Sequence, residues 1–241
     1  MTDAGFASVV FDCDSTLAAI EGIDELAGVD AAEIRALTDR AMRGEVPLES
    51  VYGLRLARIR PSRAQVEALG RAYVAALVPD AHATVSALRW LGKDVRVLSG
   101  GLRPPVSALA ASLGIPDEAI AAVDVSFDQA GDYQGFAEDS PLARSGGKAE
   151  AIAGWRLPRP TLLVGDGATD LEARPAVDGF AAYMGVAYRP AVAAGADFVV
   201  TSRSIAPVLA LAASAADRAR LQDSAFAALL RSAVRLLDTS S

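Results

Sequence analysis

Short apolar runs without polar alternation recur along the chain, separated by longer stretches whose apolar residues return every three or four positions. A run without alternation is typical of a strand buried on both faces, as in a parallel sheet covered by helices. The longer stretches have the spacing of amphipathic helices. We assign strands to residues 9–11, 95–98, 162–164, 180–184 and 198–200. Strands that alternate with helices predict an α/β protein with a doubly wound parallel sheet.

A long helical segment, 18–78, follows the first predicted strand. Its apolar residues recur at helical spacing, prolines interrupt it, and no strand pattern occurs in it. Connections within a domain are normally much shorter, so we predict that this segment forms a cap over one edge of the sheet. The predicted organisation is a core of residues 1–17 and 79–203 with a β-hairpin at about 123–136, a helical cap of residues 18–78, and a C-terminal helical extension of residues 204–241.

Composition and charge narrow the class of protein. The 241 residues are 52% hydrophobic, which supports a sizeable core, and the net charge of −7 counts against nucleic-acid binding. Cys13 is the single cysteine, so no disulfide framework exists, and the single His82 leaves no basis for a histidine-dependent triad. The N-terminus lacks a signal-peptide pattern, and the longest uncharged apolar stretch, 205–216, is too short to span a bilayer. We expect a cytoplasmic protein that binds neither nucleic acid nor membrane.

Acidic residues follow two of the predicted strands. Asp12 and Asp14 come directly after the first strand, and Asp166 and Asp170 follow the third. The carboxyl ends of parallel strands form the edge where open α/β sheets bind ligands. Neighbouring carboxylates repel each other unless a cation lies between them or one keeps a proton, and Mg²⁺ takes carboxylates together with phosphate oxygens. The aspartates therefore indicate a Mg²⁺ site for phosphate chemistry. The alternative is an Asp-rich turn that leads into a helix N-cap.

Two further motifs contain residues that bind anions. Ser99, Gly100 and Gly101 end the second predicted strand ahead of a helix start, where backbone N–H groups can face an anion; an ordinary glycine turn is the alternative. Lys148 follows two glycines and is one of two lysines among 23 basic residues. A lysine ammonium is a compact charge that fits beside a carboxylate and a phosphate, where a broad guanidinium does not.

These separated motifs resemble, in this order, the four motifs of the haloacid dehalogenase superfamily of phosphotransferases. The resemblance extends to the phosphoserine phosphatase family within it. It covers about residues 8–200 and is carried by segments 21–26, 40–42, 55–57, 61–63, 99–101, 145–148 and 165–173. It implies a Rossmann-like core with a cap inserted after the first strand. It also implies Mg²⁺-dependent hydrolysis of phosphoserine to serine and phosphate through an aspartyl phosphate, the last step of serine synthesis.

The resemblance implies a role for each matching residue of the core. Asp12 would be the nucleophile, and Asp14 would protonate the leaving serine oxygen and later deprotonate water. Mg²⁺ would be held by the Asp12 carboxylate, the Asp14 backbone carbonyl and Asp166. Asp170 would lie close to the metal without binding it. The phosphoryl oxygens would be held by Ser99, Gly100, Gly101 and Lys148.

The resemblance also implies how the substrate's serine part is recognised. Glu21 would pair with its ammonium and Arg55 with its carboxylate. Other positions that match substrate contacts of the family are Met42, Arg43, Thr169 and Arg189. Arg43 stands where a glycine is common, so a contact there would come from its backbone. Departures from the family at Leu48 and at 183–185 leave the core chemistry untouched.

Two other functions remain compatible with the sequence. One is a phosphatase of the same fold that acts on another small phosphomonoester, against which the presence of both Glu21 and Arg55 argues. The other is a non-catalytic phosphoserine-binding module, against which the presence of the nucleophile and of Lys148 argues.

The C-terminal extension lies beyond the resemblance. It contains one apolar stripe at helical spacing, formed by Leu221, Ala225, Phe226, Leu229, Leu230, Ala233, Val234 and Leu237. We expect a helix that packs on its own core. The alternative is self-association as a homodimer through this stripe.

Overall fold

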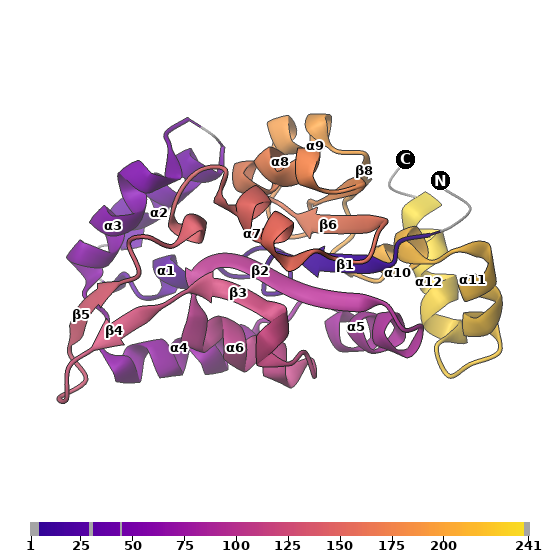
Figure 1. Cartoon of the computed structure of the whole chain (residues 1–241), viewed down its shortest axis with the longest axis horizontal. Coiled ribbons are helices and arrows are strands. Elements are labelled where there is room, and N and C mark those ends of the chain that lie inside the picture. Colours follow the sequence, from indigo (N-terminus) through magenta and orange to yellow (C-terminus); the bar gives the residue numbers. More distant parts are fainter. Residues whose placement is uncertain (1–4, 29–30, 44, 239–241) are drawn as a thin grey trace.

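A six-stranded parallel sheet forms the centre of the computed structural model, which describes residues 5–28, 31–43 and 45–238 (Figure 1). The strand order is β3-β2-β1-β6-β7-β8, so the first strand lies in the middle. All four residues of β1 are buried because helices cover both faces of the sheet. The strands are β1 Ser8–Phe11, β2 Asp94–Leu102, β3 Ile120–Val123, β6 Thr161–Gly165, β7 Gly179–Tyr183 and β8 Phe198–Val200.

Helices cover the sheet in two layers, which confirms the predicted α/β fold (Figure 1). On one side lie α4 Arg63–Ala75, α5 Ala81–Trp90 and α6 Arg103–Ser112. On the other side lie α7 Gly147–Trp155, α8 Ala168–Ala173 and α9 Pro190–Gly195. The pairing brings Phe11 opposite both Val97 of β2 and Val164 of β6. The residues that follow these three positions therefore arrive at the same edge of the sheet.

The structure differs from the predicted strands in two places. The second strand does not end before Ser99 but continues through Gly101 to Leu102, with a register shift between Leu98 and Leu102 where it pairs with β3. Val123, which we assigned to the β-hairpin, belongs to β3 instead; the hairpin consists of β4 Val125–Phe127 and β5 Tyr133–Phe136. The turn between β3 and β4 is a single residue, which is too short to leave a loop signal in the sequence.

The segment after β1 is helical, as predicted. Its helices are α1 Gly22–Glu25, α2 Ala31–Met42, α3 Leu48–Ile59 and α4. Helix α3 lies against the hairpin, where the Tyr52 and Phe136 ring centroids are 5.1 Å apart. Helix α4 instead packs along α6 beneath the sheet (Figure 1). Residues 18–78 thus contact the core on two sides, and the division into a core and a cap at residue 78 stays a prediction.

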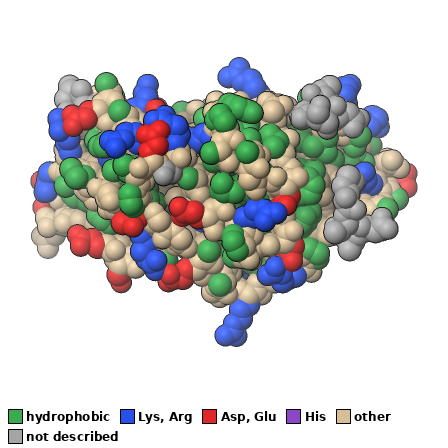
Figure 2. Space-filling model, turned by 90° about the horizontal axis from the view of Figure 1, so that it is seen from above, with side chains coloured by type: hydrophobic (Ala, Val, Ile, Leu, Met, Phe, Trp, Pro, Cys, Tyr) green, Lys and Arg blue, Asp and Glu red, His purple; other side chains and the backbone are tan. Residues whose placement is uncertain are grey.

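Charged side chains of both signs are interspersed on the face shown in Figure 2. Exposed ion pairs of the chain include Arg43 with Glu45, Arg58 with Glu33 and Arg103 with Asp124. Because acidic side chains lie among the basic ones, the described residues of this face form no continuous basic stripe. None of the described helices is long and apolar enough to cross a membrane.

The C-terminal extension forms three helices, α10 Pro207–Ala212, α11 Ala215–Gln222 and α12 Ala227–Asp238. The single helix that we expected over residues 221–237 is therefore wrong: the Ser224 hydroxyl accepts a hydrogen bond from the Phe226 N–H and donates one to the Leu221 carbonyl, which ends α11 and begins a new helix. Helix α12 packs on α10, and Leu230 and Ala233 are buried. The helices α11 and α12 lie at the end of the sheet where β1 and β2 begin (Figure 1).

A partly buried ion pair attaches this extension to the core. The Lys93 ammonium lies 2.9 Å from Asp217 of α11 and donates to the Phe6 carbonyl at 2.7 Å. On the surface nearby, the Trp90 and Phe226 rings pack with centroids 5.9 Å apart. These contacts and the buried seam with α10 place the apolar stripe largely against the chain's own core.

We expect Leu230→Ala to lower the free energy of unfolding by about 2–4 kcal/mol, because it leaves a cavity in the seam between α10 and α12. Val234 is 37% exposed on the same helix, so Val234→Ala is the matched control and should cost less than about 1 kcal/mol. Urea unfolding measures both variants. A halved mass of the Leu230→Ala protein in light scattering would show instead that this helix holds two chains together.

Candidate active site

A cavity opens at the edge of the sheet where β1, β2 and β6 end. Core and cap both contribute to its walls. Among the residues predicted for the site, those that line it are Asp12, Asp14, Glu21, Met42, Arg55, Gly100, Gly101, Lys148, Asp166 and Thr169. The structure therefore brings together side chains from almost the whole length of the chain.

Asp12 is buried directly after the central strand. Its Oδ1 accepts a hydrogen bond of 2.7 Å from the Cys13 N–H, and its Oδ2 lies 3.0 Å from the Lys148 ammonium. Burial raises the pKa of Asp12 well above the ordinary value, the neighbouring Asp170 raises it further, and Lys148 opposes both effects. An ionised Asp12 therefore depends on positive charge held close to it. Cys13 is buried in the core, as we expected from its position after a strand.

Lys148 supplies part of that charge from the first turn of α7. Its ammonium is buried, 3.0 Å from Asp12 and 2.7 Å from Asp170 Oδ1. Burial alone would lower the pKa of Lys148, but the two carboxylates outweigh it and raise the pKa above its ordinary value. The lysine therefore stays charged and holds the two aspartates on either side of it.

Three carboxylates could hold a metal ion. One oxygen each from Asp12, Asp166 and Asp170 lies within 4.8 Å of the others, and all three residues are buried. A set of hard oxygen ligands around a buried negative charge fits Mg²⁺. The approach of Asp170 requires glycine at Gly165, since a Cβ there would lie 2.2 Å from the Asp170 carboxyl carbon.

The three carboxylates differ in how many of their oxygens already accept hydrogen bonds. Both oxygens of Asp170 are engaged, Oδ1 by Lys148 and Oδ2 by the Gly167 N–H at 3.1 Å. The Asp166 Oδ1 accepts from Thr16 at 3.1 Å. Asp170 is therefore better placed to orient Lys148 than to ligate an ion.

Asp14 lies next to the triad and faces the cap. Its Oδ1 accepts hydrogen bonds from the Gly22 N–H at 2.6 Å and the Tyr73 hydroxyl at 2.5 Å. Its Oδ2 is 3.4 Å from the hydroxyl of Ser99. Burial raises the pKa of Asp14, against the lowering effect of Tyr73 and Gly22. A raised pKa makes the protonated form of this carboxyl group more accessible, which a proton donor requires.

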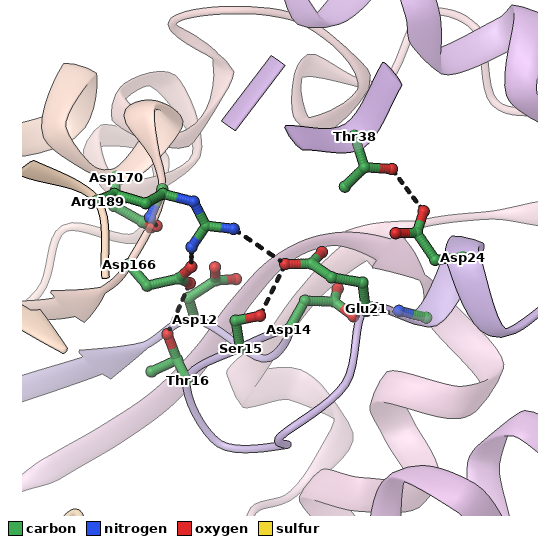
Figure 3. Close-up of polar contacts among 12 residues, drawn as sticks. Asp12, Asp14, Ser15, Thr16, Glu21, Asp24, Thr38, Asp166, Asp170 and Arg189 are labelled. Carbon is green, nitrogen blue, oxygen red and sulfur yellow. Dashed lines mark hydrogen bonds and ion pairs between the residues drawn. The ribbon is translucent and has the colours of Figure 1, made fainter. Parts of the chain in front are cut away.

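Glu21 lies at the mouth of the cavity between β1 and the cap. Its Oε1 accepts from the Ser15 hydroxyl at 2.7 Å and from Arg189 at 3.3 Å. Figure 3 shows Arg189 reaching between the carboxylates of Glu21 and Asp166, with both of which it forms ion pairs. Burial and the nearby Asp14 raise the pKa of Glu21 to about 7, although Arg189 opposes this.

Arg55 comes from α3 and is buried in the cavity wall. Its guanidinium donates to the Thr38 hydroxyl at 2.7 Å, and Thr38 donates in turn to Asp24 at 2.5 Å (Figure 3). The guanidinium also lies over the Tyr52 ring, 5.6 Å from its centroid. These neighbours fix a buried positive charge whose Nε has no hydrogen-bond partner among the described residues.

Residues of the second strand lie differently from the sequence-based assignment, and the side chain of Arg43 takes no part in the cavity. Ser99 and Gly101 lie within β2, and the Gly101 N–H donates to the Ser99 hydroxyl at 2.9 Å, so this N–H is satisfied locally. The side chain of Arg43 is exposed and paired with Glu45, outside the cavity. Any contact of Arg43 with a ligand would have to come from its backbone.

Sequence reasoning missed several residues of this site, above all Tyr73, Thr38 and Asp24. Each is a polar side chain at a position that the apolar pattern assigned to a helix interior. A hydroxyl or carboxyl group buried there needs a hydrogen-bond partner. That requirement was the available signal, but it does not identify the partner.

Comparison with known proteins identifies relatives of this chain. The family model of haloacid dehalogenase-like hydrolases matches residues 9–174. The chain is 42% identical over 200 residues to the chloroplastic phosphoserine phosphatase of Arabidopsis thaliana, covering 80% of this chain and 68% of that protein. It is 40% identical to the phosphoserine phosphatase of Rattus norvegicus, covering 80% and 88%.

Solved structures give the same result. A phosphoserine phosphohydrolase-like protein from Francisella tularensis superposes with a TM-score of 0.76 at 25% identity, over 85% of this chain and 98% of that one. A substrate-bound phosphoserine phosphatase complex superposes with a TM-score of 0.74 at 25% identity, over 85% and 97%. The chain therefore belongs to the haloacid dehalogenase-like hydrolases and, within them, to the phosphoserine phosphatase family.

Proposed function

We propose that the protein is a Mg²⁺-dependent phosphatase that hydrolyses phosphoserine to serine and phosphate. The observation that carries this proposal is the content of one cavity. Asp12, Lys148 and Asp166 line it from the sheet and the helices that follow it, and Glu21 and Arg55 line it from the segment of residues 18–78. The first group suits a phosphoryl group, and the second suits an ammonium and a carboxylate.

Asp12 would attack the phosphorus atom in the first step. The bond from phosphorus to the serine oxygen breaks, and its electron pair stays on that oxygen, which takes a proton from Asp14. Lys148 is within 3.0 Å of the nucleophile and would hold a phosphoryl oxygen together with the Ser99 hydroxyl. The product of this step is serine and an aspartyl phosphate at Asp12.

Hydrolysis of the aspartyl phosphate would use the same residues in reverse roles. Asp14, now ionised, takes a proton from water as the water oxygen attacks phosphorus, and the bond to Asp12 breaks to release phosphate. The raised pKa of Asp14 suits a group that must exist in both protonation states during one turnover.

The metal site fits this chemistry. When bound by Asp12, Asp166 and the Asp14 carbonyl, Mg²⁺ would supply positive charge against the phosphoryl oxygens. Asp170 would keep Lys148 in place, since it donates no proton and accepts from the ammonium at 2.7 Å. Lys148 adds a fixed charge that needs no reorganisation during the reaction.

The cap would select the amino acid. Glu21 lies in the loop after β1 and Arg55 lies in α3. Because they come from different elements and line the same cavity, they can contact two ends of one small ligand. Met42 and Thr169 line the space between cap and core. Arg189 pairs with Glu21 and would share it with the substrate's ammonium. The homodimer and the cytoplasmic location stay predictions.

Phosphate release from phosphoserine, with Mg²⁺ and after chelation by EDTA, tests the proposal directly. We expect turnover with Mg²⁺ and loss of turnover in EDTA that added Mg²⁺ restores. Release of phosphate from other small phosphomonoesters but not from phosphoserine would identify a different substrate. No release from any of them would favour a binding module.

We expect Asp12→Asn to abolish turnover, because a neutral amide cannot attack phosphorus. The fold should persist, since asparagine has the same shape, and circular dichroism checks this. Trapping with labelled phosphoserine should label the wild-type protein transiently and leave Asp12→Asn unlabelled. More than a few per cent of the wild-type rate in this variant would contradict the covalent mechanism.

We expect Arg55→Ala to lower kcat/KM for phosphoserine by about two orders of magnitude or more. The loss of one charged contact in a buried site costs roughly 2–5 kcal/mol, and about 1.4 kcal/mol corresponds to tenfold. The same variant should barely affect p-nitrophenyl phosphate, which has no carboxylate. Arg58→Ala, on the exposed face of the same helix, is the matched control. Equal losses on both substrates would show that Arg55 supports the fold rather than specificity.

The pKa of about 7 at Glu21 predicts a pH-dependent preference. Glu21 is ionised above this pKa and neutral below it, and a neutral carboxyl group cannot pair with the substrate's ammonium. The ratio of kcat/KM for phosphoserine to that for p-nitrophenyl phosphate should therefore fall as the pH decreases through about 7. Glu21→Gln should make this ratio low and independent of pH. A pH-dependent ratio in that variant would place the titration elsewhere.

A further inference from the structure

The hydroxyl of Tyr73 makes a contact that none of the assigned roles explains. Tyr73 lies in α4, the helix of residues 18–78 that packs along α6 beneath the sheet. The side chain is fully buried, yet its hydroxyl lies 2.5 Å from Asp14 Oδ1 inside the site. A phenol hydroxyl next to a carboxylate oxygen donates its hydrogen to that oxygen, so Tyr73 is the donor in this contact.

The two oxygens of Asp14 have unequal surroundings. Oδ1 accepts two short hydrogen bonds, from Tyr73 and from the Gly22 N–H at 2.6 Å. Oδ2 faces β2, where its contact with the Ser99 hydroxyl is longer, at 3.4 Å. Ser99 is one of the groups that would hold the phosphoryl oxygens, so Oδ2 is the oxygen that faces the reacting atoms.

Two glycines lie close to the Tyr73 hydroxyl. A Cβ at Gly22 would lie 2.0 Å from the hydroxyl oxygen, and one at Gly101 would lie 3.3 Å from it. Glycines on both the cap side and the β2 side thus allow the ring of Tyr73 to reach Asp14. The aromatic ring has two rotatable bonds only, so its burial in the interface of α4 fixes the hydroxyl.

We propose, on the basis of the function proposed above, that Tyr73 is a positioning residue that makes Oδ2 of Asp14 the oxygen that carries the transferred proton. With the proton on Oδ2, Oδ1 is a carbonyl oxygen that accepts from Tyr73 and Gly22. After Oδ2 has given its proton to the serine oxygen, Oδ1 accepts the same two hydrogen bonds. The donors therefore need not rearrange in either direction of proton transfer, which is the property of a preorganised site.

The proposal distinguishes two kinds of leaving group. The serine oxygen is a poor leaving group and needs the proton of Asp14 as the bond to phosphorus breaks. The p-nitrophenolate anion leaves without a proton, so the first step with p-nitrophenyl phosphate does not use Asp14 as an acid. A residue that acts only by positioning Asp14 should therefore affect the first turnover of one substrate and not of the other.

Tyr73→Phe tests this with enzyme in excess over substrate, so that only the first turnover is observed. We expect the disappearance of phosphoserine to slow by about tenfold or more, as misplacement of a reacting group does. Release of p-nitrophenol in the same regime should change less than about twofold. The matched control is Tyr183→Phe, which removes another buried hydroxyl, hydrogen-bonded to the Arg203 carbonyl outside the site; it should leave both first-turnover rates unchanged.

A double-mutant cycle adds a second measurement. If Tyr73 acts through Asp14, then Tyr73→Phe should have no further effect on phosphoserine in an Asp14→Asn background, whereas independent effects would multiply. Equal slowing of both substrates, no slowing of either, multiplied effects, or a variant that no longer folds would each overturn the proposal. A wild-type protein that does not cleave phosphoserine at all would instead overturn the proposed function.

Discussion

The buried contact of Lys148 with Asp12 and Asp170 is the constraint on which the rest of the site depends. Three carboxylates lie together in the protein interior, and a lone ammonium is placed among them. Carboxylates that are removed from water repel one another and favour their neutral form. The excess of negative charge around Asp12 therefore favours the binding of a further cation. The positive charge that keeps Asp12 ionised also attracts phosphoryl oxygens. Positive charge beside Asp12 is thus needed both to keep the buried carboxylates ionised and to bind a phosphoryl group.

The central position of β1 brings the charged residues of the site together. Its neighbours are β2 and β6, so Asp12 and Asp166 follow the ends of β1 and β6, and Ser99 lies beside them within β2, without any long loop. The glycine at Gly165 permits Asp170 to fold back toward Lys148. Because these contacts come from rigid elements, their positions vary less than those of residues on loops. Arg55 and Glu21, which we propose select the substrate, come instead from α3 and from the loop between β1 and α1.

The sequence was sufficient to predict five of the six strands of the described sheet, the helical segment after β1 and many of the side chains that line the cavity, but not the edge strand β3. These predictions depend on local signals: buried strands are apolar throughout, and charges that follow them lie at the carboxyl edge. The continuation of β2 through Ser99 and Gly101 was missed because two glycines normally end a strand, whereas here the pairing with β3 resumes at Leu102. The break after α11 was missed because the apolar stripe continues through it, while the hydrogen bonds of Ser224 decide where the helix ends.

Tyr73 and Thr38 show what periodicity cannot supply. Both occupy buried positions of helical stripes, where the pattern predicts packing and nothing more. Their hydroxyl groups reach partners far away in the sequence or on another helix, Asp14 in one case and Asp24 with Arg55 in the other. A buried hydroxyl without a partner would cost about 1–3 kcal/mol, so each of them must be matched to a charged group by the tertiary fold. The helices of the cap therefore do two things at once. Their apolar residues pack into the protein interior, and their buried hydroxyl groups form hydrogen bonds with Asp14 and Arg55 in the cavity wall.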